Sequence, residues 1–62
     1  MKQITAKELT LISDALTYEA LICKKARIYS KTLTDVELAE SMTMIADEHE
    51  RRYNALLKII GG

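Results

Sequence analysis

Glu19 and His49 are the residues of this chain best suited to chemistry. His49 is the only histidine, and it lies in the polar run Asp47-Glu48-His49-Glu50-Arg51-Arg52-Tyr53. A carboxylate beside an imidazole can bind iron, manganese or zinc, can transfer protons, or can form an internal hydrogen bond. Which of these applies depends on the elements that position the two residues.

The first of these elements begins in the segment Ile4-Thr5-Ala6-Lys7-Glu8-Leu9. Thr5 stands where an N-cap residue would, and Glu8 follows three residues later, which is the pattern of a capping box. Ile4 and Leu9 stand at the two positions of a hydrophobic staple. This pattern predicts a helix that starts at about residue 6.

The same pattern occurs again at Leu33-Thr34-Asp35-Val36-Glu37-Leu38. Here Thr34 would be the N-cap with Glu37 at N3, and Leu33 and Leu38 would form the hydrophobic staple. No proline or glycine interrupts either segment, and Gly61 and Gly62 stand where a second helix should end. We predict helices over about residues 6–31 and 35–60. The short connection makes residues 1–62 one domain, an all-α antiparallel helical hairpin.

Both helices have wide apolar faces, of roughly 160° in the first and roughly 120° in the second. A face this wide suits a helix with two neighbours, so we expect two hairpins to form a four-helix bundle. Glu19 and His49 are the ionisable residues near the centres of these faces. The predicted core and interface residues are Leu9, Ile12, Leu16, Glu19, Ile22, Cys23, Ala26, Leu38, Met42, Ile45, His49, Tyr53, Leu56 and Ile60.

Composition limits the class of protein. A chain of 62 residues buries little surface, and its single cysteine allows no disulfide within the chain, so we expect a homodimer or a higher homo-oligomer. Nine basic and nine acidic residues give no net charge, which argues against nucleic acid or a membrane surface as the partner. The lone thiol and the lack of a long apolar run favour the cytoplasm.

Three interpretations of the Glu19 and His49 pair remain open. The carboxylate accepts a hydrogen bond from His49, or from a tyrosine hydroxyl, and fixes the register of the core. Alternatively, two chains supply two glutamates and two histidines to a metal ion. A general acid-base site is the third interpretation, but no nucleophile or oxyanion donor set accompanies the pair, so we do not expect an enzyme.

Three segments carry a resemblance to a known family: Lys24-Lys25-Ala26-Arg27-Ile28-Tyr29, then Leu33 to Leu38, then Glu48-His49-Glu50. Together they resemble short bacterial spore-coat proteins of the coat F type, and the hairpin looks like half of a ferritin-like bundle. The resemblance implies Glu19 and His49 as metal ligands. Ferritin-like sites also use a carboxylate three residues before the histidine, and Ala46 occupies that position here.

We therefore expect a non-catalytic structural protein, associated with the spore coat after assembly in the cytoplasm and in contact with itself and with other coat proteins. No cofactor is expected under this interpretation. The alternative is a ferritin-like bundle that binds iron, manganese or zinc through Glu19 and His49. A third interpretation is a dimeric adaptor that docks a partner protein on an outer face containing Leu21, Ile28 and Met44.

Overall fold

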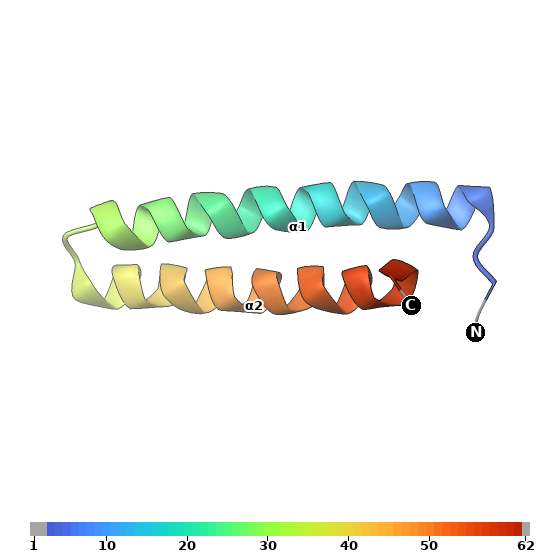
Figure 1. The fold of residues 1–62 in the computed structure, drawn as a ribbon. Coiled ribbons are helices and arrows are strands. Elements are labelled where there is room, and N and C mark those ends of the chain that lie inside the picture. The colour runs from blue at the N-terminus through green and yellow to red at the C-terminus, as the bar shows by residue number, and fades with distance from the viewer. Residues whose placement is uncertain (1–2, 62) are drawn as a thin grey trace.

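The computed structural model describes residues 3–61 as two α-helices lying side by side. Helix α1 runs Ala6–Thr32, and helix α2 runs Val36–Gly61. The short segment 33–35 reverses the chain, so the helices are antiparallel (Figure 1). No strand occurs within residues 3–61. The predicted all-α hairpin is confirmed, and each helix boundary lies within one residue of its predicted position.

The start of α1 follows its sequence signal. The Thr5 hydroxyl accepts a hydrogen bond from the backbone N–H of Glu8 at 3.1 Å, and the Glu8 carboxylate accepts one from the Thr5 N–H at 3.0 Å. The predicted capping box is confirmed. At the other end the N–H of Leu33 bonds to the carbonyl of Tyr29 at 3.0 Å, and extended backbone at Leu33 (φ −73°, ψ 133°) ends the helix.

The start of α2 departs from its sequence signal. Asp35 is the N-cap, because its carboxylate accepts a hydrogen bond from the N–H of Leu38 at 2.9 Å. The prediction of a second capping box between Thr34 and Glu37 was therefore wrong. With Asp35 as the N-cap, the preceding position, where a hydrophobic staple has its first residue, holds Thr34 and not Leu33. A charged carboxylate suits the positive end of the helix dipole and is a better cap than a threonine hydroxyl.

The residues most completely enclosed between the helices are two alanines. Ala26 of α1 is 4% exposed and Ala46 of α2 is 0% exposed, and they are the only buried residues in the described part of the chain. Small side chains let helix backbones come close. Half-buried residues at spacings of three and four flank them and form one line of contact along each helix: Ile12, Leu16, Glu19 and Cys23 on α1, and Met42, His49, Tyr53, Leu56 and Ile60 on α2.

Not every residue predicted for the core is covered in the single hairpin. Leu9, Leu38 and Ile45 remain exposed, whereas Ile22 is half-buried. A layer of two helices covers only one side of each helix, so the outer parts of a wide apolar face stay open. Gly61 is the last residue of α2, and Gly62, which was also expected at the helix end, lies outside the described residues.

Candidate functional site

Glu19 and His49 lie in direct contact at the middle of the hairpin. Each comes from the inward line of its helix, and the two residues are equally far in sequence from the turn. His49 Nδ1 donates to Glu19 Oε1, because an ionised carboxylate offers only acceptor atoms. The side chains are 14% exposed for Glu19 and 15% for His49, so the pair is largely shielded from water.

This geometry gives a single hairpin too few ligands for a structural metal site. The contact uses Nδ1 and one carboxylate oxygen, which leaves Nε2 and the second oxygen as possible ligand atoms. Within residues 3–61, no group of three or more histidine, cysteine, aspartate or glutamate side chains is placed to hold a metal ion. Ala46, where a ferritin-like site has a carboxylate, is fully buried. Structural metal sites generally use four ligands, twice what one chain provides here.

The bond to Glu19 comes from the histidine and not from a tyrosine. Tyr18 and Tyr29 lie on the exposed surface of α1. Tyr53 is half-buried and lies along a surface groove on one flank of the hairpin. An imidazole and a carboxylate that satisfy each other inside a helical pair act as an internal polar clasp, which penalises any register that separates them.

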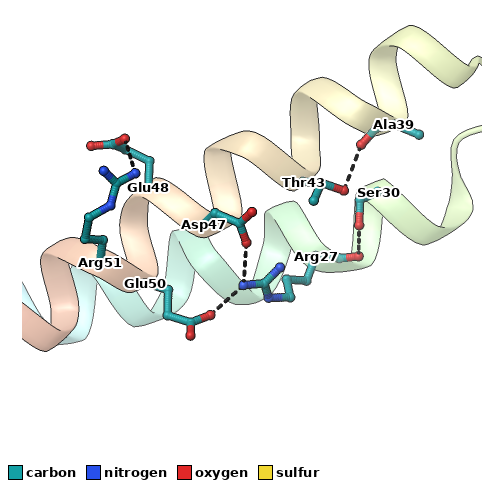
Figure 2. Close-up of polar contacts among 8 residues, drawn as sticks. All are labelled: Arg27, Ser30, Ala39, Thr43, Asp47, Glu48, Glu50 and Arg51. Atoms are coloured by element: carbon teal, nitrogen blue, oxygen red, sulfur yellow. Dashed lines mark hydrogen bonds and ion pairs between the residues drawn. The ribbon is translucent and has the colours of Figure 1, made fainter.

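A second polar cluster joins the helices on one flank. Arg27 of α1 reaches across to two carboxylates of α2, bonding to Asp47 at 3.0 Å and also to Glu50 (Figure 2). These two hydrogen bonds, first that to Glu50 and then that to Asp47, raise the pKa of Arg27 above its ordinary value. The guanidinium therefore stays charged, and the cluster acts as a clamp between the helices.

This clamp was not predicted from the sequence. Asp47 and Glu50 were placed only in the polar run around His49, and Arg27 only in the segment 24–29. The signal was nevertheless present, because Arg27, Asp47 and Glu50 each directly follow an inward residue of their helix. Charges beside the inward line of two paired helices commonly meet across the contact. The other ion pairs of α2 join Glu48 to Arg51 and Arg52 within the helix itself.

The clamp borders a surface groove of about 430 Å³, whose walls include Cys23, Ile28 and Tyr53. Cys23 is a free, half-buried thiol, which fits its predicted place on the apolar face. The residues considered for an adaptor surface, Leu21, Ile28 and Met44, are all exposed.

In comparisons with protein-family models, curated proteins and solved structures, nothing matches this chain. Within residues 3–61, neither helix has a stretch that is apolar and long enough to cross a bilayer.

Proposed function

We propose that this chain is a non-catalytic structural protein that assembles with a second copy of itself into a four-helix bundle. The proposal rests on the large number of apolar side chains that a single hairpin leaves exposed. Among the described residues only two alanines are buried, whereas thirteen large apolar side chains are exposed. A lone hairpin in this state has almost no core, and two-layer packing is the ordinary solution for helices with one open apolar face.

The accessible surface area of the hairpin supports the same proposal. The hairpin exposes 5076 Å². A compact monomer of 7.0 kDa would expose about 4,000 Å². The excess of roughly 1,000 Å² is close to the area of about 800 Å² that each partner buries in a standard protein interface. Covering one face of the hairpin with a second copy would account for the excess.

Light scattering coupled to size-exclusion chromatography tests the assembly. The expected mass is twice the 7.0 kDa of one chain. The thermal midpoint should also rise with protein concentration, because the dimer is stabilised by mass action and the unfolded chain is not. A folded chain of 7.0 kDa whose midpoint stays constant over a hundredfold range of concentration would overturn the proposal.

The place of assembly is proposed from the resemblance to coat F type proteins. The segments that carry it are residues 24–29, 33–38 and 48–50. A small, self-assembling hairpin with no net charge is suited to packing with itself and with other coat proteins. Antibody detection in coat extracts of spores tests this location. Detection only in vegetative cells would remove the coat role and leave the assembly in place.

The contact between Glu19 and His49 keeps metal binding as a second candidate. One hairpin supplies two ligand residues, and a second copy would supply two more. Elemental mass spectrometry of untagged protein is the test, with Glu19→Gln and His49→Gln as controls. Stoichiometric iron, manganese or zinc that both variants lose would establish metal binding. Metal content that both variants retain would place the metal elsewhere and leave the pair as a clasp.

A further inference from the structure

Six of the thirteen exposed large apolar residues lie on one flank of the hairpin. Position along a helix advances by about 100° per residue, so residues seven apart lie on nearly the same side. This spacing relates Leu11 to Tyr18 on α1 and Leu38 to Ile45 on α2. We define the open face by six exposed residues: Leu11, Tyr18, Tyr29, Leu38, Ile45 and Ile59.

The open face consists of one row of residues on α1 and one row on α2. Two observations place both rows on one flank, opposite the Arg27 clamp. Leu11 of α1 and Ile59 of α2 line the same surface groove, of about 330 Å³, so the two rows border one side of the hairpin. Arg27 and Glu50 line a different groove. Tyr29 and Arg27 lie two residues apart, which separates them by about 160° around α1. The clamp thus joins the helices on one flank, and the open face lies on the other, where Arg52 stands seven residues after Ile45 and seven before Ile59.

The open face is symmetric about the Glu19 and His49 contact. On α1, Leu11 and Tyr29 stand nine residues on either side of position 20, and Tyr18 and Ile22 stand two residues on either side. A second α1 running antiparallel about this point would set each member of these pairs against the other. Leu11 would then meet Tyr29, and Tyr18 would meet Ile22.

Helix α2 has the same symmetry at the same level. Leu38 and Ile59 lie symmetrically about positions 48 and 49. The bond between Glu19 and His49 shows that the midpoints of the two rows are side by side. A single two-fold axis perpendicular to the helices would therefore serve both rows, with Leu38 against Ile59 and Ile45 against Arg52 of the second copy. The two hairpins would lie antiparallel, with their turns at opposite ends of the bundle.

Charge favours this orientation over one with both turns at the same end. Lys25 lies on the α1 row, seven residues after Tyr18, and the antiparallel arrangement sets it against Ala15 and next to Asp14 of the second copy. Within the described residues, neither Lys25 nor Asp14 forms an ion pair inside the hairpin. With both turns at one end, the two copies of Lys25 would lie at the same level. Charges at an interface rim select orientation in this way.

We propose that the open face is the self-association surface, that a second copy covers it, and that the two-fold axis passes at the level of the Glu19 and His49 contact. The inference rests on the proposed assembly and deepens it by naming the face and the orientation. The Arg27 flank remains outside the interface.

The face is tested by two matched substitutions on α2. Ile45 is 39% exposed and lies on the open face, whereas Leu57 is 43% exposed and lies seven residues after Glu50, on the clamp flank. Because each lysine would face Arg52 of the second copy and the two-fold axis repeats this contact, Ile45→Lys should weaken the dimer by about a hundredfold or more in Kd. Leu57→Lys should leave Kd within about threefold of the unsubstituted chain. Sedimentation equilibrium measures Kd, and circular dichroism checks that helix content is kept.

The outcomes separate this inference from the proposed assembly. A wild-type chain that stays monomeric removes both. A wild-type dimer that survives Ile45→Lys, or that Leu57→Lys disrupts as strongly, overturns the assigned face and leaves the dimer standing. If Ile45→Lys loses helix content, the distance between spin labels at the turn decides, since it needs no substitution on the open face.

The orientation is measured between spin labels at the turn. Thr34→Cys provides an exposed site, with Cys23→Ala to remove the native thiol. Turns at opposite ends would put the labels about 40 Å apart, the length of a helix of 27 residues. Turns at the same end would put them within about 20 Å, since neighbouring helices lie 8–10 Å apart. The short distance would overturn the antiparallel arrangement.

Discussion

Replacing both members of the Glu19 and His49 pair by leucine should stabilise the protein or leave its stability unchanged, although each single replacement destabilises it. The reason is that a polar group enclosed by a helix pair costs most when it loses its partner. Removing both partners removes that cost and adds apolar contact. The prediction is therefore one of strong coupling between two residues from different helices.

The burial of the pair sets the size of each effect. Breaking a fully buried ion pair costs 3–5 kcal/mol, and Glu19 is 14% exposed, so His49→Leu should cost about 2–3 kcal/mol. Glu19→Leu leaves the N–H of the His49 imidazole without its acceptor and should cost about 1–2 kcal/mol. The double variant should be as stable as the wild type or more stable, by up to about 4 kcal/mol. The coupling energy is then at least about 3 kcal/mol.

Urea unfolding followed by circular dichroism measures these energies, at one fixed protein concentration because assembly contributes to stability. The matched control is the exposed pair of Glu48 and Arg51, whose side chains are 46% and 70% exposed. Replacing both of these with glutamine should give a coupling below about 0.5 kcal/mol. A Glu19 and His49 double variant that is as unstable as the sum of its single variants would refute the reasoning, because the loss would then come from side-chain shape and not from an unpaired polar group.

Three smaller perturbations test other parts of the hairpin. Asp35→Ala should lower the free energy of unfolding by about 1 kcal/mol, because it removes the N-cap of α2, whereas Thr34→Ala should have almost no effect. Equal effects of the two substitutions in urea unfolding would contradict the assignment of Asp35 as the N-cap. Ala46→Leu should destabilise by about 1–3 kcal/mol because Ala46 is fully buried between the helices, and Ala55→Leu on the exposed side of α2 should be neutral. A neutral Ala46→Leu would mean that the helices separate easily. Arg27→Met should lower the thermal midpoint at low salt but not in 1 M salt, where charges are screened over about 3 Å. A thermal midpoint lowered equally at both salt concentrations would mean that Arg27 acts through packing and not through its charge.

The local features of the fold were predictable because their signals lie within a few residues. Thr5 and Glu8 make the predicted capping box, since both partners of each hydrogen bond lie in one helical turn. The short connection and the apolar spacing were enough to predict an antiparallel hairpin. The second cap was misassigned because Thr34 and Asp35 are adjacent and both can act as caps. Their order of preference depends on charge, which the threonine-based motif does not consider.

The contacts between the helices were decided by the tertiary structure. The sequence determined two amphipathic helices and the central places of Glu19 and His49 within them. It did not determine how far each helix turns about its own axis, because that depends on which side chains from distant positions fit together. The tertiary structure settles that rotation, because Ala26 and Ala46 are buried between the helices and Arg27 bonds to carboxylates of α2 on one flank. The open face on the other flank stays uncovered, since two helices in contact shield only the sides that face each other.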